Sequence, residues 1–483
     1  VALLRPGAAA GGLNSTDLNY PRFPVEGDLQ AAQRAAAADV RHNRGAEGAP
    51  GAAAYTGPSM GLAPNQTRRE LSGGARLLTA ALPDRSSASL VLMFSVGSRY
   101  EEDTIGGASH FIEHLFFKGT RRRPSAKAIA EAIEGVGGVM NASTDKEVTV
   151  YWCRVPAERL DLATDVLCDI VTDSQLAPAD VERERMVILE ELKMYLDQPQ
   201  DYVHSLFEQI MWPRHSLGRD IIGTAESVAG TSREQLLEYI HAQYSLRNLV
   251  VGLSGSIDPD RSARELEARL RLPAGGNGHA STVPAPLDSP QLLLQAKKTE
   301  QAHICLGTRA TSYLDPDRYA LDLLNTILGE GMSSRLFLEI REKRGLAYDV
   351  HSFTSKHRDA GYFAVYMGVD PKKAEEAVNA VLGVLRQISE RSVPPKELTK
   401  AKEYTKGRLR LGLEGTNSLA SWLCQQELLM GEVRTVEEVT ARIDAVTPDD
   451  IRRVAQRVLD QPIRMAIIGP FKSETPFLAA IGA

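Results

Sequence analysis

The sequence has few cysteines, and their spacing does not pair them. Only four cysteines occur in 483 residues, and no two of them form a C-x-x-C motif. A disulfide framework or a cysteine-based metal site normally needs cysteines at short, ordered spacings. We therefore expect reduced, buried thiols in a cytoplasm-like compartment. The same spacing makes the four cysteines poor candidates for metal ligands: Cys153, Cys168, Cys305 and Cys424.

The sequence also lacks long apolar runs and a large excess of either positive or negative charge. One of the longest apolar runs, ASLVLMF at 88–94, is far too short to span a bilayer and is typical of a buried strand. The net charge of −6 gives no reason to expect nucleic acid or an anionic membrane as a partner. We therefore expect a globular protein without nucleic-acid or membrane partners. The predicted location is the cytoplasm, with an organelle matrix as the alternative.

The first 67 residues lack the apolar periodicity of a folded domain. They are rich in Ala, Gly and Pro, and such a segment buries too little apolar surface to offset its ordering entropy. The opening VALLRPGAAA resembles a targeting peptide weakly, but Asp17, Glu26 and Asp28 argue against one. We predict that residues 1–67 form a disordered extension.

The remaining sequence divides into two halves with the same order of elements. The Gly-, Ser- and Pro-rich stretch 274–290 is typical of a linker between domains at 68–273 and 291–483. Strand–Pro–helix patterns recur in the halves as VTVYWCRVPAERLDLATDVL and YFAVYMGVDPKKAEEAVNAVL, and a Pro-led helix follows each. This recurrence indicates an internal duplication of an α+β unit.

The segment SHFIEHLFFKGT, residues 109–120, carries the strongest chemical signal. On the helix expected at 107–117, His110 and His114 lie one turn apart, so both imidazoles can reach one metal ion. Glu113 is rotated around the helix and is placed to take a proton from metal-bound water. The H-x-x-E-H order is itself a metallopeptidase signature, although a structural or fortuitous histidine pair is the simpler alternative.

A catalytic zinc site needs a third protein ligand, and the helix expected at 178–196 offers candidates. Glu184, Ile188 and Glu191 share one stripe of this helix, where a carboxylate is costly to bury unless it is paired or bound to metal. The neighbouring Glu190 is an alternative, although it is equally compatible with a solvated surface charge. The spacing favours Glu191 over Glu190 only modestly.

The motifs together resemble those of the M16 zinc metallopeptidases, the insulinase, pitrilysin and mitochondrial-processing-peptidase-like family, and in particular its short M16B subfamily. The resemblance extends from about residue 70 to about residue 470. It is carried by GASHFIEHLFFKGT, GGVMNASTDKEVTVY, VERERMVILEEL, HSLGRDIIGT and GMSSRLFLEIREKRGLAYDV. The long N-terminal extension is the one departure from the family's pattern.

The resemblance implies a role for each residue of the site. His110, His114 and Glu191 would bind one zinc ion per chain, Glu113 would be the general base, and Glu184 would support the site. In an overlay of the two halves, His110 falls on Asp322 and Glu191 near Arg408. The second half would therefore be an inactive repeat without the metal cluster.

The resemblance also implies how substrate is bound. The strand around VMNAST would be an exposed edge that pairs with an extended peptide, with Asn141 and Ala142 near the scissile bond. Arg341 and Tyr348 match the family's pair that contacts substrate and polarises its carbonyl. The substrates would be peptides or unfolded polypeptide segments.

The family further implies an assembly. The two α+β units would form a half-clamshell, and two chains would enclose a chamber as a homodimer or as a heterodimer with an M16 paralogue. Two other functions are compatible with this scaffold. One is a non-catalytic partner subunit, which would lack the H-x-x-E-H residues that this chain retains. The other is a zinc-stabilised peptide-binding module, which would not need Glu113.

The predicted extension gives a first test. A chain that lacks residues 1–67 should retain its activity, and limited proteolysis of the full chain should remove this segment first, because its composition does not support a packed core. A sharp gain or loss of turnover in the truncated chain would show that the extension is regulatory.

Overall fold

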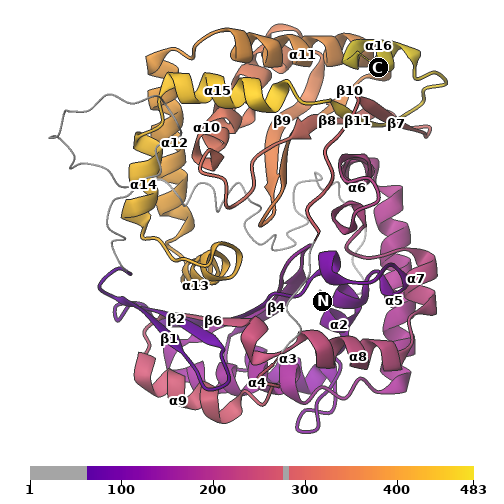
Figure 1. Cartoon of the computed structure of the whole chain (residues 1–483). Coiled ribbons are helices and arrows are strands. Elements are labelled where there is room, and N and C mark those ends of the chain that lie inside the picture. Colours follow the sequence, from indigo (N-terminus) through magenta and orange to yellow (C-terminus); the bar gives the residue numbers. More distant parts are fainter. Residues whose placement is uncertain (1–61, 276–281, 483) are drawn as a thin grey trace, which may run out of the picture. The chain divides into compact units, whose positions relative to one another are not determined.

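The computed structural model describes residues 62–275 and 282–482, which form two compact units (Figure 1). The first unit includes Arg68–Pro284 and Gly415–Cys424, and the second includes Ala285–Glu414 and Gln425–Ala483. Residues 1–61 of the predicted extension lie outside the described residues, as does part of the predicted linker. The first strand begins at Gln66, so the last two residues of the predicted extension belong to a strand.

A six-stranded mixed sheet forms the centre of the first unit. Its strand order is β1-β2-β6-β3-β5-β4, in which β2 pairs with β6 in parallel while β3 pairs with β5 and β6, and β4 with β5, antiparallel. The strands are β1 (Gln66–Glu70), β2 (Arg76–Ala81), β3 (Ser87–Phe94), β4 (Val139–Thr144), β5 (Thr149–Pro156) and β6 (Leu249–Gly255). Strand β4 is therefore an edge strand.

Helices cover this sheet and bury its apolar side chains. Leu90, Leu92 and Phe94 of β3 belong to one buried core with Phe111 and Leu115 of the helix that carries the histidines. The helices of the first unit are α2 (Ala108–Phe116), α3 (Ala126–Glu134), α4 (Leu160–Thr172), α5 (Pro178–Asp197), α6 (Pro199–Met211), α7 (Ala225–Gly230), α8 (Arg233–Gln243) and α9 (Pro259–Arg269).

One helix of the first unit comes from much later in the sequence. Residues 415–424, which include most of α13 (Thr416–Gln425), belong to this unit. The hydroxyls of Thr416 and Ser89 lie 2.8 Å apart. A Cβ on Gly252 of β6 would lie 2.6 Å from the Ala420 carbonyl oxygen, so glycine permits the close approach of helix and strand. Sequence order alone places this helix with the second half of the chain.

The second unit repeats the architecture with a five-stranded sheet. Its order is β7-β11-β8-β10-β9, with β7 and β11 parallel and the other pairs antiparallel. The strands are β7 (Gln291–Ala296), β8 (Ala302–Arg309), β9 (Ala347–Lys356), β10 (Gly361–Val369) and β11 (Arg464–Gly469). The helices are α10 (Arg318–Gly329), α11 (Ala374–Glu390), α12 (Pro395–Gly412), α14 (Val436–Asp444), α15 (Pro448–Leu459) and α16 (Thr475–Ile481).

The two units share one chain order of elements. In the first, β3 is followed by α2, the edge strand β4, its neighbour β5 and the helices α4 and α5; in the second, β8 is followed by α10, β9, β10, α11 and α12. The spatial orders β6-β3-β5-β4 and β11-β8-β10-β9 correspond as well. The predicted α+β class and the predicted duplication are confirmed.

The helical segment that carries Arg341 differs from an ordinary α-helix. Residues Phe337–Lys343 form a π-helix, in which hydrogen bonds span five residues instead of four. Such segments are rare in proteins overall, and those that occur are often found at functional sites. This one contains Arg341.

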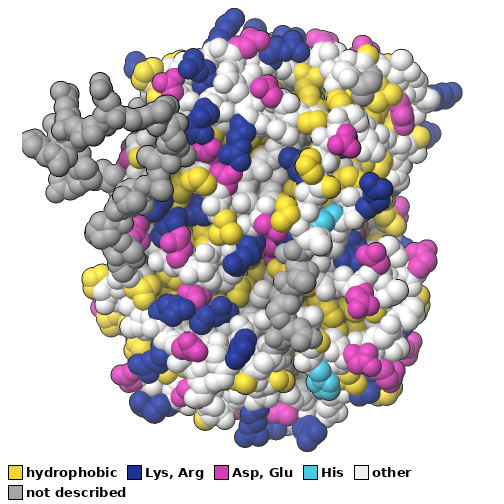
Figure 2. All heavy atoms as spheres, in the orientation of Figure 1, with side chains coloured by type: hydrophobic (Ala, Val, Ile, Leu, Met, Phe, Trp, Pro, Cys, Tyr) yellow, Lys and Arg dark blue, Asp and Glu magenta, His cyan; other side chains and the backbone are white. Residues whose placement is uncertain are grey.

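The cysteines and the surface charges match what the composition led us to expect. The four cysteines are buried and form no disulfide. No helix within 62–275 and 282–482 has both the length and the apolar character that crossing a bilayer requires. Basic and acidic side chains are interspersed over the face drawn in Figure 2.

Candidate metal centre

The position of α2 is fixed at its N-terminus. Gly107 has φ 96°, and a Cβ there would lie 2.5 Å from the Ile222 carbonyl oxygen, so the position requires glycine. The buried Glu101 carboxylate accepts hydrogen bonds from the backbone N–H groups of Gly107 (2.8 Å) and Ser109 (2.7 Å). Burial raises the pKa of Glu101, although these bonds oppose the rise. The helix start is thus held directly before His110.

The two histidines and one carboxylate of α5 converge. The rings of His110 and His114 have centroids 4.7 Å apart. The Glu191 Oε2 atom lies 3.9 Å from His110 Nε2 and 3.7 Å from His114 Nε2. One donor atom from each residue lies within 4.8 Å of the others. In the described part of the chain, this is the one group of three or more potential ligands that comes so close together.

This donor set fits a zinc ion. Two imidazole nitrogens and one carboxylate are a known ligand set of catalytic zinc sites, which leave a fourth position open. Burial, with a smaller effect from His114, lowers the pKa of His110 to about 3, so its imidazole is neutral and can act as a ligand. Partial burial raises the pKa of Glu191, and a bound divalent cation would favour its ionised form.

The structure distinguishes Glu191 from the adjacent Glu190. Glu190 is not part of the cluster and forms an ion pair with Lys193 at 2.6 Å. Its side chain is 62% exposed, as expected for a surface charge on the outer face of a helix. Helical spacing did not decide between the two residues, and the structure identifies Glu191 as the candidate third ligand.

Glu184 contacts the cluster from behind His114. Its carboxylate is 3% exposed and lies 3.2 Å from His114 Nδ1 through one oxygen and 2.8 Å from Lys118 Nζ through the other. Burial alone would raise the pKa of Glu184, but the contacts with His114 and Lys118 outweigh it, and the pKa lies below its ordinary value. The ionised Glu184 can accept the Nδ1 proton of His114, which leaves Nε2 for a metal.

Glu113 is held from the edge strand. The hydroxyl of Thr144, the last residue of β4, donates a 2.6 Å hydrogen bond to Glu113 Oε2. Burial raises the pKa of Glu113, and the Thr144 bond opposes this rise.

The predicted substrate residues lie on two different units. Asn141 and Ala142 are on β4, the edge strand that ends at Thr144 in the first unit. Arg341 and Tyr348 lie in the second unit, where Arg341 Nη1 donates to the Tyr348 carbonyl oxygen at 2.8 Å. The guanidinium also lies 4.7 Å from the Tyr348 ring centroid and 4.9 Å from that of Phe337, and Tyr348 is 75% exposed.

Two contact residues were not singled out by the sequence reasoning. Lys118 follows His114 by four residues, as His114 follows His110, so a repeated spacing of four was a usable signal. Thr144 gave no comparable signal, because a threonine at the end of a strand is common. Its contact depends on how the strand lies beside α2.

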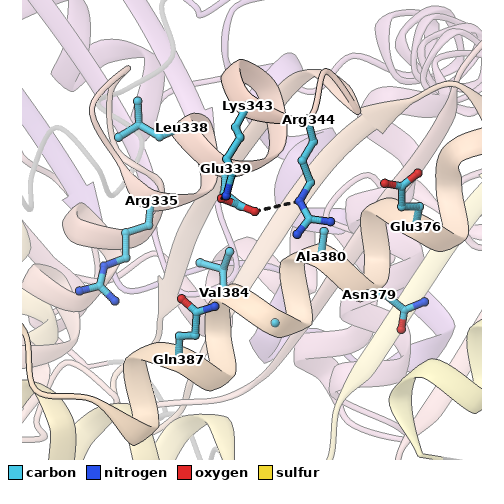
Figure 3. Close-up of a pocket in the computed structure, with 11 residues that line it drawn as sticks. Arg335, Leu338, Glu339, Lys343, Arg344, Glu376, Asn379, Ala380, Val384 and Gln387 are labelled. Atoms are coloured by element: carbon cyan, nitrogen blue, oxygen red, sulfur yellow. Dashed lines mark hydrogen bonds and ion pairs between the residues drawn. The ribbon is translucent and has the colours of Figure 1, made fainter.

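A separate cavity of about 510 Å³ lies in the second unit, between the π-helix and α11 (Figure 3). Its basic side chains have acidic partners in the structure. Lys343 and Arg344 both contact Glu339, at 2.9 and 2.8 Å, and Arg335 contacts Glu397 at 2.7 Å. The cavity contains none of the predicted site residues, so the metal cluster is the stronger candidate site.

Comparison with known proteins agrees with the geometry. Residues 76–225 match the family model described as insulinase (peptidase family M16), and residues 231–404 match the model of the peptidase M16 inactive domain. An uncharacterized zinc protease of Streptomyces coelicolor is 40% identical over 84% of this chain and 90% of its own length. Another from Bacillus subtilis is 35% identical over 83% of this chain and 98% of its own length.

Solved structures share the fold. A protease from Helicobacter pylori superimposes with a TM-score of 0.78 at 22% identity, over 84% of this chain and all of that one. The structure of a peptidase M16 inactive domain from Pseudomonas fluorescens superimposes with a TM-score of 0.78 at 20% identity, over 85% of this chain and 99% of that one. The family predicted from the motifs is confirmed.

The cluster predicts which residues retain metal. The wild-type chain should carry one equivalent of zinc, and His110→Ala or Glu191→Ala should lose it, because two ligands hold zinc far more weakly than three. Glu190→Ala is the matched control and should keep the full equivalent. The measurement is metal content by mass spectrometry after gel filtration. Full zinc in His110→Ala would rule out this ligand set.

Proposed function

Because this chain belongs to the M16 (insulinase) peptidase family, we propose that it is a zinc-dependent endopeptidase that cleaves peptides or unfolded polypeptide segments. The observation that carries the proposal is the convergence of His110, His114 and Glu191 beside Glu113. A metal-binding cluster alone would supply binding, whereas an adjacent carboxylate held by a hydrogen bond also supplies proton transfer.

In this proposal each group has a defined task. His110, His114 and Glu191 would hold the zinc, which when bound would supply Lewis-acid activation of water. Glu113 accepts a proton from the attacking water and later delivers it to the leaving amine. The hydrogen bond from Thr144 to Oε2 holds this carboxylate in place.

Strand β4 supports binding of an extended peptide. It is the last strand of its sheet and pairs on one side with β5, so its other side can pair with a substrate main chain. Pairing of this kind requires neither a free terminus nor a particular side chain, which favours an endopeptidase of limited selectivity. Folded proteins seldom offer an unpaired extended segment, so flexible polypeptides are the expected substrates.

The general base provides the test that separates a peptidase from a zinc-stabilised binding module. Glu113→Gln should keep zinc and fold but lose about 10²- to 10⁴-fold in turnover, because the amide cannot accept the proton. Glu190→Gln, the same change on the exposed side of α5, is the control and should leave turnover unchanged. The assay is cleavage of a peptide library, mapped by mass spectrometry with and without a chelator. Unchanged cleavage by Glu113→Gln would favour the binding module.

We also propose that the active enzyme is a dimer in which Arg341 and Tyr348 of one chain serve the metal cluster of the other. The proposal rests on the family, whose long members carry four units in one chain, with the zinc on the first and the Arg/Tyr pair on the fourth. This chain has two units, with the cluster in the first and the exposed Tyr348 in the second. A closed chamber would then admit flexible peptides and exclude folded proteins.

Complementation tests the dimer. A mixture of inactive Glu113→Gln and Tyr348→Phe chains should regain activity, because one site of each mixed dimer would be intact. The control is a mixture of Glu113→Gln with Glu191→Ala. Both of these lesions lie in the first unit, so every site would stay damaged. If the first mixture remains as inactive as the control, the site is not shared between chains in this way.

A further inference from the structure

Beside the metal cluster, the side chains of Lys118, Glu184 and His114 form a continuous line of contacts that ends at a candidate metal ligand. Lys118 Nζ lies 2.8 Å from Glu184 Oε1, and Glu184 Oε2 lies 3.2 Å from His114 Nδ1. Since His114 Nε2 is the atom that faces Glu191, the line ends at the metal position. We propose that Lys118 is a positioning residue that fixes Glu184 and, through it, the orientation of His114. This inference rests on the proposed zinc function.

The first step is the way Lys118 reaches α5. Helix α2 ends at Phe116, and the Lys118 N–H donates to the Leu115 carbonyl oxygen at 3.0 Å in the turn that closes the helix. The Lys118 side chain then crosses to Glu184, which is on α5. The ion pair therefore joins the end of one ligand-bearing helix to the middle of the other.

The second step is the state of Glu184. With 3% exposure, this carboxylate has little access to water, and an unpaired charge there would be strongly unfavourable. Each of its two oxygens has one partner, Lys118 or His114. Loss of Lys118 would free one oxygen, so the carboxylate could rotate or take a proton and would orient His114 less well.

The third step is the contrast between the two histidines. Within the described residues, no protein group forms a hydrogen bond with the buried Nδ1 of His110. His114 has a partner whose own position is fixed by a cation. Outer contacts of this kind usually contribute 10- to 100-fold to metal affinity.

A purely structural role for Lys118 makes a different prediction. A lysine near a helix C-terminus interacts favourably with the helix dipole, and a buried ion pair contributes to folding whether or not metal is present. Either effect would change the stability of the metal-free chain and leave its affinity for zinc unchanged. Zinc affinity and metal-free stability must therefore be measured separately.

The experiment compares zinc affinity, by chelator competition, with thermal unfolding in excess EDTA. Lys118→Met should bind zinc about 10- to 100-fold more weakly than wild type. Lys118→Arg keeps the cation and should stay within about threefold of wild type, a range well below the loss expected for a missing outer contact. Lys406→Met is the matched control, because Lys406 pairs with Asp444 at 2.6 Å in the second unit and is 15% exposed, against 16% for Lys118. It should change unfolding without changing zinc affinity.

The outcomes separate this inference from the proposed function. If wild type binds zinc and Lys118→Met binds it equally well, the positioning role is wrong while the zinc function stands. If wild type binds no zinc, the proposed function itself fails. If Lys118→Met does not fold, Lys118→Gln replaces it in the comparison with wild type, because glutamine removes the charge and keeps a polar side chain. An equal loss of affinity in Lys118→Arg and Lys118→Met would also overturn the role assigned to the cation.

Discussion

Where α2 packs against α5, the first unit brings several ionisable side chains together, most of them largely buried and Glu191 still 44% exposed. His110, His114, Glu113, Glu184 and Glu191 lie there within two helices of one core. Burying carboxylates is unfavourable unless they are paired, and within residues 62–275 and 282–482 Glu184 is the one of these three carboxylates that forms an ion pair with a lysine or arginine, at Lys118. The remaining carboxylates have raised pKa values from burial. A divalent cation held by the histidines and Glu191 would compensate them, which is why metal binding and the architecture of this contact are coupled.

The second unit meets the same constraint without a metal. Asp322, which the sequence overlay places on His110, is buried in α10 and forms an ion pair with Lys356 at the end of β9. Nearby, Asn325 and Thr326 share the carboxylate of Glu330. In both cases the buried polar groups find partners within the second unit. The duplicated scaffold thus has an ion pair in the second unit at the place where the first unit has the cluster proposed to bind zinc.

The general base and the edge strand are linked by a single contact. Thr144 ends β4 and donates to Glu113, so the strand proposed to pair with substrate also holds the residue proposed to move protons. Since a general base must lie within hydrogen-bond distance of its water, small changes in β4 would affect catalysis as well as binding. Binding and chemistry are therefore expected to be hard to separate by substitutions in this strand.

The sequence by itself determined the α+β class, the duplication, and the candidates His110, Glu113 and His114, because helical spacing and repeated patterns are local properties. It also indicated an acidic ligand on α5. Helical spacing left both Glu190 and Glu191 open, and the family resemblance selected Glu191. Only the tertiary structure showed that Glu191 meets the histidines, found the contacts of Lys118 and Thr144, and placed α13 in the first unit. The physical reason is common to all of these: each depends on which side chains meet across separate elements, and such contacts are set by helix rotation and by packing at places such as Gly252. Residues adjacent in sequence, such as Glu190 and Glu191, have the same chemistry and differ only in the direction that packing gives them.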